Sequence, residues 1–225
     1  DDKERMIKYF EWDIESKEHN SGNIITYKPS ELSSRGTYEV VGDFSSAAFM
    51  IVAGLIARDS RILVKNVGMN PTRSGLLHVL KSMGGKISIQ NTATICNEEV
   101  ADILVESSDL QGVDVKGDII PIIIDEIPIL SIAASFAKGT TLIKDAAELR
   151  VKESDRLAAI SDGLLKINID HELFDDGIKI NGSDKDIDDL VEIDSHGDHR
   201  IAMSFLIASL RSKNGIYVNF HFYTS

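Results

Sequence analysis

The stretch SSAAFMIVAGLIA at residues 45–57 is apolar on nearly every side when it is wound as a helix. Two later stretches have the same character, PILSIAASFA at 128–137 and RIAMSFLIASL at 200–210. Each is too long for a typical strand and too short to cross a bilayer, so the pattern predicts helices that are buried inside protein. Three buried helices are therefore expected to organise the fold.

The sequence repeats its course after the first two of these stretches. In both places a β-like run, at 61–65 and at 140–144, leads through a turn into an amphipathic helix and another β-like run. The third stretch leads into a β-like run at 216–220, and residues 4–16 resemble the end of such a unit. Apolar residues of the two copies match at an offset of 80 residues in four pairs: Leu77 and Leu157, Leu80 and Ile160, Ile87 and Ile167, Ile89 and Ile169. We therefore predict an α/β (α+β) fold of repeated units, truncated within a unit at both ends.

The composition argues against several classes of protein. The chain has 225 residues with 24 basic and 36 acidic side chains, a formal charge of −12, and 43% hydrophobic residues. Net acidity argues against binding to nucleic acid or to membrane surfaces, although a local basic cluster can still hold a small anion. The single Cys96 excludes an intramolecular disulfide. Because no signal peptide and no apolar run near about 18 residues are found, we expect a cytoplasmic protein.

Each buried stretch has an aspartate at or near its start, namely Asp43 in GDFSS, where Ser45 and Ser46 are further candidates for a cap, Asp125 in DEIP and Asp198 in GDHR. The simplest interpretation is capping, because short polar side chains there accept hydrogen bonds from the free N–H groups of the first turn. Helix N-termini also attract anions, and equivalent ends of repeated elements often lie close together. Three such ends can build one anion site.

The most highly charged segment is ELRVKESDRL at 148–157, which opens the amphipathic helix of the second unit. Glu153 and Arg156 are three residues apart and share a helix face, so an exposed ion pair at a helix start is one interpretation. The equivalent segment of the first unit, NPTRSGLL at 70–77, carries only Arg73. Because the charge is specific to one unit, we favour a functional role.

Other chemistries have little support in the sequence. His196, Asp198 and His199 lie close together, but no HExxH or CxxC pattern accompanies them, so a metal site is not expected. The GxSxG pattern of a serine nucleophile and the spacing of a P-loop are both absent. The polar stretch at 181–194, with its acidic run DKDIDD, is interpreted as a solvated surface loop.

Four motifs in this order, GDFSSAAF, DEIP, ELRVKESDR and GDHRIAMSF, resemble the C-terminal half of the 5-enolpyruvylshikimate-3-phosphate (EPSP) synthase family. The resemblance implies an enolpyruvyl transferase-like inside-out barrel, in which repeated βαβαββ units surround buried parallel helices whose N-termini face a cleft between two domains. It also implies transfer of the enolpyruvyl group of phosphoenolpyruvate to the 5-hydroxyl of shikimate 3-phosphate, with loss of phosphate. This step belongs to aromatic amino acid biosynthesis, and neither a metal nor an organic cofactor is implied.

The resemblance assigns a role to each charged residue of these motifs. Asp125 is similar to the carboxylate that contacts the shikimate hydroxyls and takes the 5-hydroxyl proton, with Glu126 as the alternative because family members place this acid differently. Glu153 resembles the acid/base that protonates the phosphoenolpyruvate methylene and later removes a proton from the intermediate. The other matches are to substrate-binding residues. Lys152 resembles a residue beside the acid/base site, Arg156 and Arg200 resemble the clamps for the phosphate and carboxylate of phosphoenolpyruvate, and His199 matches the border of the phosphoenolpyruvate site.

The same resemblance sets expectations for the domains. Residues 1–40 match the end of the N-terminal domain and the crossover, with a boundary loop at 28–40, and residues 41–225 match an incomplete C-terminal domain. The family's N-terminal Lys-Ser-Arg cluster and central Ser-Gln segment are absent from these residues. We therefore expect the chain alone to be inactive, to require the N-terminal domain, and to belong to a monomeric enzyme that binds neither nucleic acid nor membrane. Two alternatives stay open, a non-catalytic repeat domain for binding or assembly and an enolpyruvyl transferase with another acceptor.

Overall fold

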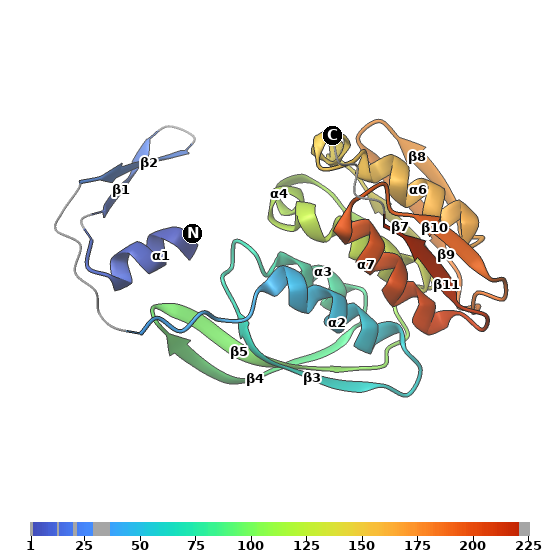
Figure 1. Ribbon diagram of the computed structural model, residues 1–225, viewed down its shortest axis with the longest axis horizontal. Coiled ribbons are helices and arrows are strands. Elements are labelled where there is room, and N and C mark those ends of the chain that lie inside the picture. The colour runs from blue at the N-terminus through green and yellow to red at the C-terminus, as the bar shows by residue number, and fades with distance from the viewer. Residues whose placement is uncertain (1, 13, 20–21, 29–36, 221–225) are drawn as a thin grey trace.

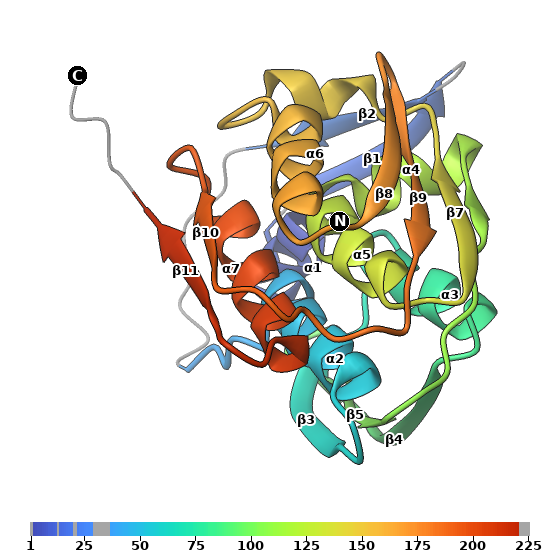
Figure 2. The same cartoon turned by 90° about the vertical axis from the view of Figure 1, so that its right-hand side faces the viewer.

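Three helices form the centre of the fold. The structure, a computed structural model, describes residues 2–12, 14–19, 22–28 and 37–220. The central helices are α2 (Phe44–Ile56), α5 (Ile127–Ser135) and α7 (His199–Ala208), and each contacts the other two. Figure 1 labels α2 and α7, and Figure 2 labels all three. Every residue of α5 is buried. The predicted buried helices are confirmed, although α7 leaves Met203 and Leu206 exposed on its outer side.

Strands and amphipathic helices surround this centre in three successive units (Figure 2). The first unit contains α2, β3 (Arg61–Gly68), α3 (Gly75–Ser82), β4 (Lys86–Ile95) and β5 (Glu98–Glu106). The second contains β6 (Asp114–Val115), α4 (Ile120–Ile123), α5, β7 (Gly139–Ile143), α6 (Arg156–Lys166), β8 (Asp170–Phe174) and β9 (Gly177–Gly182). The third contains β10 (Val191–Asp194), α7 and β11 (Ile216–Asn219).

The units share one topology. Each central helix connects two parallel segments, which are Gly42 and Val67 around α2, β6 and β7 around α5, and β10 and β11 around α7. The later strands of the first two units then pair antiparallel, in the orders β3-β5-β4 and β6-β7-β9-β8. The second unit therefore has the βαβαββ order that the sequence resemblance implied.

The amphipathic helices α3 and α6 end alike but begin differently. The N–H groups of the C-cap residues Met83 and Ile167 both bond to the carbonyl four residues back, and a left-handed residue follows each. These ends are 167 − 83 = 84 residues apart, whereas the starts, Gly75 and Arg156, are 156 − 75 = 81 apart. Helix α6 thus has 11 residues against 8 in α3, and the additional residues lie at its start.

This difference corrects the constant offset of 80 residues that the sequence pattern indicated. The offset matches buried leucines and isoleucines within the two helices, but it fails after them. Ile87 and Ile89 lie in β4, whereas Ile167 and Ile169 lie at the end of α6 and before β8. Apolar residues recur in both helices and strands, so matching letters alone did not reveal the longer helix.

The N-terminal part forms a helix and a hairpin. α1 (Asp2–Tyr9) precedes β1 (Ile14–His19) and β2 (Gly22–Tyr27), which pair antiparallel, as expected for the end of a unit. α1 contacts β5, and Arg5 Nη1 lies 3.6 Å from Glu98 Oε2. The predicted boundary loop at 28–40 falls largely on residues 29–36, which lie outside the described residues.

The acidic run at 184–189 is more than the solvated loop that its composition predicted. Arg211, only 6% exposed, donates from Nε to Asp186 Oδ1 at 2.6 Å. The same guanidinium donates from Nη1 to the carbonyl of Ile56, the last residue of α2, at 3.4 Å. Ile187 is 5% exposed and belongs to the core. Arg211 therefore ties the C-terminal end of α2 to this run.

A glycine determines how closely α6 and α7 pack. A Cβ atom at Gly163 would lie 2.0 Å from Cζ of Phe205, a ring that is 1% exposed. We expect Gly163→Ala to lower the free energy of unfolding by about 1–2 kcal/mol, because overpacking a filled core costs up to about 3 kcal/mol and alanine regains only roughly 1 kcal/mol in helix propensity. Urea denaturation of the variant and the parent protein measures this difference.

Leu165 on the same helix provides the control for this substitution. Its side chain is 70% exposed, so Leu165→Ala should change the free energy of unfolding by no more than about 0.5 kcal/mol. If Gly163→Ala were as stable as the parent, the ring of Phe205 could shift without cost and the packing argument would be wrong.

Candidate active site at the N-termini of the central helices

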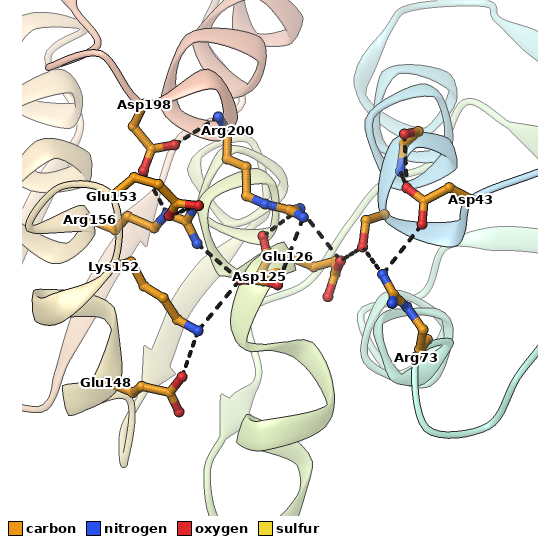
Figure 3. A network of polar contacts seen from close by, with 12 residues as sticks. Asp43, Arg73, Asp125, Glu126, Glu148, Lys152, Glu153, Arg156, Asp198 and Arg200 are labelled. Carbon is orange, nitrogen blue, oxygen red and sulfur yellow. Dashed lines mark hydrogen bonds and ion pairs between the residues drawn. The ribbon is translucent and has the colours of Figure 1, made fainter. Parts of the chain in front are cut away.

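Polar side chains gather where the N-termini of α2, α5, α6 and α7 meet, as Figure 3 shows. Asp43 caps α2, because its Oδ2 accepts a hydrogen bond from the N–H of Ser46 at 2.8 Å. Asp198 caps α7, because its Oδ1 accepts from the N–H groups of Arg200 at 2.8 Å and Ile201 at 3.3 Å. The predicted capping role of these two aspartates is confirmed.

The start of α5 is built differently. Glu126 occupies the N-cap position without a capping hydrogen bond from its side chain, and Pro128 is the second residue of the helix instead of the first. A 3₁₀ turn at Ile124–Glu126 precedes the helix. The carboxylates of Asp125 and Glu126 consequently bond to neighbouring elements and not to the start of their own helix.

Arg156 is the centre of the network. Its side chain has 0% exposed surface, and each nitrogen of its guanidinium bonds to a different carboxylate. Nε lies 2.7 Å from Asp198 Oδ2, Nη1 lies 3.0 Å from Asp125 Oδ1, and Nη2 lies 2.5 Å from Glu153 Oε2. One buried cation thus joins the starts of α5, α6 and α7.

Asp125 is surrounded by three cations. Besides Arg156, Lys152 Nζ lies 3.8 Å from its Oδ1 and Arg200 Nη2 lies 3.8 Å from its Oδ2. Lys152 also pairs with Glu148 at 2.6 Å. The side chain of Asp125 is 40% exposed, so a carboxylate that a ligand can reach is held among positive charges.

Glu126 faces the first unit. It is 4% exposed, accepts a hydrogen bond from Ser45 Oγ at 2.5 Å, and its Oε1 lies 3.8 Å from Arg200 Nη1. Arg73 Nη2 donates to Ser45 Oγ at 3.2 Å and lies 3.4 Å from Asp43 Oδ1. Polar contacts therefore link Arg200 through Glu126 and Ser45 to Arg73, as the dashed lines in Figure 3 show.

Two carboxyl pKa values at the site are displaced in opposite directions. Burial raises the pKa of Glu126, and the Ser45 hydrogen bond and the charge of Arg200 offset this only in part. Burial also disfavours the charged form of Asp198, but the hydrogen bond and charge of Arg156 and the N–H groups of α7 outweigh it. The pKa of Asp198 therefore lies below its ordinary value.

The structure brings most of the predicted site residues together. Asp125, Lys152, Glu153, Arg156 and Arg200 belong to one network, whereas His199, the exposed first residue of α7, lies outside it. The sequence pattern did not reveal the contribution of Ser45, which was considered only as a cap. It also did not reveal that of Arg73, which served only to show that the segment at 70–77 carries less charge than the segment at 148–157. Glu148 was missed as well.

A cavity of about 170 Å³ lies beside this network, with Ser45, Thr72, Arg73 and Asp125 in its polar lining. Among the described residues, no group of three or more histidine, cysteine, aspartate or glutamate side chains is arranged to hold a metal ion. In the same part of the chain, every helix is too short or too polar to cross a membrane.

Comparisons with known proteins point to one family. The family model of EPSP synthase (3-phosphoshikimate 1-carboxyvinyltransferase) matches residues 1–225. A 3-phosphoshikimate 1-carboxyvinyltransferase of Petrotoga mobilis is 51% identical over 219 residues, which are 97% of this chain and 50% of that protein. The solved structure of EPSP synthase from Acinetobacter baumannii superposes with a TM-score of 0.88 at 39% identity, covering 97% of this chain and 50% of that one.

A more distant likeness concerns the fold alone. The enolpyruvyl transferase NikO from Streptomyces tendae gives a TM-score of 0.69 at 15% identity, over 92% of this chain and 45% of that one. In all these comparisons the chain spans about half the length of the protein that it matches.

Proposed function

The chain belongs to the EPSP synthase family, and from this membership we propose that it forms one wall of the active site of a 3-phosphoshikimate 1-carboxyvinyltransferase. The proposed substrates are shikimate 3-phosphate and phosphoenolpyruvate, and the products are the enolpyruvyl ether at the 5-hydroxyl and phosphate. The reaction belongs to the shikimate pathway of aromatic amino acid biosynthesis.

The proposed chemistry is supported above all by the arrangement of two carboxylates around Arg156. Two nitrogens of one buried guanidinium, that of Arg156, hold two different carboxylates, Asp125 and Glu153, whose side chains are 40% and 55% exposed. A reaction that removes one proton and delivers another needs two acid/base groups whose positions relative to each other are fixed. The shared cation supplies this fixed spacing, and the helix N-termini around it favour anionic ligands.

The proposed chemistry assigns one proton transfer to each carboxylate. The oxygen of the 5-hydroxyl attacks C2 of phosphoenolpyruvate, and Asp125 takes the proton of this hydroxyl. At the same time Glu153 protonates the methylene carbon. The tetrahedral intermediate then loses phosphate as Glu153 takes a proton back from the new methyl group, which restores the double bond. Asp125 is favoured over Glu126 as the base, because the side chain of Glu126 is only 5% exposed.

The cations have different access to ligands. Arg200 and Lys152, with side chains 15% and 24% exposed, are proposed to bind the anionic groups of phosphoenolpyruvate and the other substrate, with His199 at the border. Arg156 has no exposed surface in this conformation. A substrate anion can reach its guanidinium only if the half-exposed Glu153 or Asp125 moves aside, so in this conformation Arg156 holds the two carboxylates, and its contact with phosphoenolpyruvate is proposed for the ligand-bound state alone.

The second wall of the cleft is proposed to come from the other half of a longer protein. The relatives are about twice as long as the part that matches this chain. On this proposal residues 1–40 are the end of the N-terminal domain with the crossover, and residues 41–225 belong to the C-terminal domain. Positioning and charge stabilisation from both walls lower the barrier, so one wall is not sufficient.

Phosphate release from phosphoenolpyruvate tests the proposed function directly. A protein of the relatives' length that contains this sequence should release phosphate only when shikimate 3-phosphate is added, at about 1–1000 per second, the usual range for enzymes. The 225 residues alone should show no measurable turnover.

Each outcome of this assay has a distinct meaning. Absence of turnover by the longer protein would contradict the proposed transferase and favour a repeat domain that only binds or assembles. Turnover with another acceptor, but not with shikimate 3-phosphate, would favour a transferase of different specificity. Turnover by the 225 residues alone would show that the second wall is dispensable.

A further inference from the structure

The guanidinium of Arg200 is held by two residues of the 3₁₀ turn that precedes α5. The Arg200 side chain is 15% exposed, and Nη1 donates to the backbone carbonyl of Asp125 at 3.2 Å while lying 3.8 Å from Glu126 Oε1. A free arginine side chain samples many rotamers, and a ligand that selects one of them pays the entropy of fixing it. Contacts that fix the guanidinium before a ligand arrives remove that cost.

Glu126 is itself fixed from outside its own helix. Its carboxylate is almost fully buried and does not cap α5, so its main polar contact besides Arg200 is the hydroxyl of Ser45, at 2.5 Å. A buried carboxylate needs such a donor, because burial without hydrogen bonds is costly. Ser45 lies in the first turn of α2, which belongs to another repeat unit.

Arg73 determines which way the Ser45 hydroxyl points. A hydroxyl has one proton to donate and lone pairs that accept. Because Arg73 Nη2 donates to Ser45 Oγ at 3.2 Å, the proton of Ser45 is directed to Glu126. The order of donors and acceptors therefore runs in one direction, from Arg73 in the segment before α3, through Ser45, to the carboxylate that faces Arg200.

We propose that Ser45 and Glu126 are positioning residues for Arg200, with Arg73 as their anchor in the first unit. Arg200 thereby presents its guanidinium to an anionic group of phosphoenolpyruvate in a fixed orientation. This inference rests on the proposed function, since its main readout is the transferase reaction. It gives the first repeat unit, which supplies none of the proposed acid/base residues, a part in substrate binding.

Steady-state kinetics of the complete enzyme test the proposal. Ser45→Ala removes the donor to Glu126, and Glu126→Gln keeps the size of the side chain and its ability to accept from Ser45 but removes the charge that faces Arg200. Each should raise the KM for phosphoenolpyruvate about tenfold, the effect of losing one hydrogen bond to a charged group, and change kcat and the KM for shikimate 3-phosphate much less.

Ser46→Ala is the matched control, because Ser46 is the next residue in the same turn and its hydroxyl bonds to Asp43 and not to Glu126. It should leave the KM for phosphoenolpyruvate unchanged. A structural role for Ser45 alone would lower the thermal midpoint of Ser45→Ala without a selective change in this KM, and that result would overturn the proposal.

A double-mutant cycle separates action through Arg200 from direct action. Arg200→Lys keeps the charge and loses the planar fork that Glu126 orients. If Ser45 acts through Arg200, Ser45→Ala should have little further effect on the KM for phosphoenolpyruvate in the Arg200→Lys background. Additive effects would refute the proposal. Absence of turnover by the unmodified complete enzyme would instead contradict the proposed function, so the two failures are distinguishable.

Discussion

Glu153→Gln in the complete enzyme is expected to lower kcat by about 10²–10⁴-fold, the usual effect of removing a general acid/base group. Glutamine keeps the shape of the side chain and an oxygen that accepts from Arg156 Nη2, the partner of Glu153 at 2.5 Å. It cannot donate and retrieve a proton as the proposed chemistry requires. The KM for both substrates should therefore change much less than kcat.

The neighbouring acid Glu148 provides the comparison. Glu148 lies in the same charged segment, is 60% exposed and pairs only with Lys152 among the described contacts of its side chain. Glu148→Gln should leave kcat within about a few fold, because exposed ion pairs contribute little. If Glu153→Gln retained near-normal kcat, Glu153 would be only a charge at a helix start, which was the structural interpretation of VKESDR.

Asp198→Ala is expected to destabilise the protein by about 2–4 kcal/mol, the sum of roughly 1.5–3 kcal/mol for a hydrogen bond to a charged group and roughly 1 kcal/mol for a helix cap. Asp198 and Arg156 both have 0% exposed side chains and lie 2.7 Å apart, so the substitution leaves the buried Nε of Arg156 without its carboxylate, although Asp125 and Glu153 still pair with the other two nitrogens. It also removes the cap of α7. Chemical denaturation of the purified protein measures the loss, which is a large share of a typical stability of about 5–15 kcal/mol.

Asp198→Asn separates the ion pair from the cap. Asparagine keeps an oxygen for the N–H groups of Arg200 and Ile201 but loses the charge opposite Arg156, so it should recover only the roughly 1 kcal/mol that a cap contributes. The pKa of Asp198 is lowered on folding. Its contribution is therefore fully present above the unfolded pKa of about 4 and is lost as the pH falls through the folded pKa.

Measuring stability against pH checks the contribution of Asp198 directly. The stability difference between parent and Asp198→Asn should be constant near pH 7 and should shrink in strongly acidic solution. If Asp198→Asn were as stable as the parent at pH 7, the ion pair would add nothing beyond the cap, and Arg156 would not depend on this carboxylate.

The sequence was sufficient for the elements whose signal is local. Apolar character on nearly every side distinguished α2 and α5 from surface helices, and an aspartate before each apolar stretch indicated the caps at Asp43 and Asp198. The motifs also identified the residues that surround Arg156. These features depend on neighbours in the chain, which a sequence displays directly.

The features of the fold and the site that the sequence did not predict depend on contacts between distant residues, and no local pattern displays such contacts. Ser45 and Glu126 are 81 residues apart, and only the packing of α2 against α5 brings them within hydrogen-bonding distance. Asp186 and Arg211 are 25 residues apart, so the acidic run lacked any sign of its buried partner. The complete burial of Arg156 was equally hidden, because a charged residue at a helix start is normally solvated.

The longer start of α6 makes two units of the same topology unequal at one point. Three residues of helix extend about 4.5 Å, and Arg156 is the first residue of that extension. If α6 began where α3 does, counted from their matching ends, its first residue would be Ala159, and Arg156 would lie in the preceding loop. The three additional residues thus place a guanidinium in the middle of the bundle end, between the starts of α5 and α7.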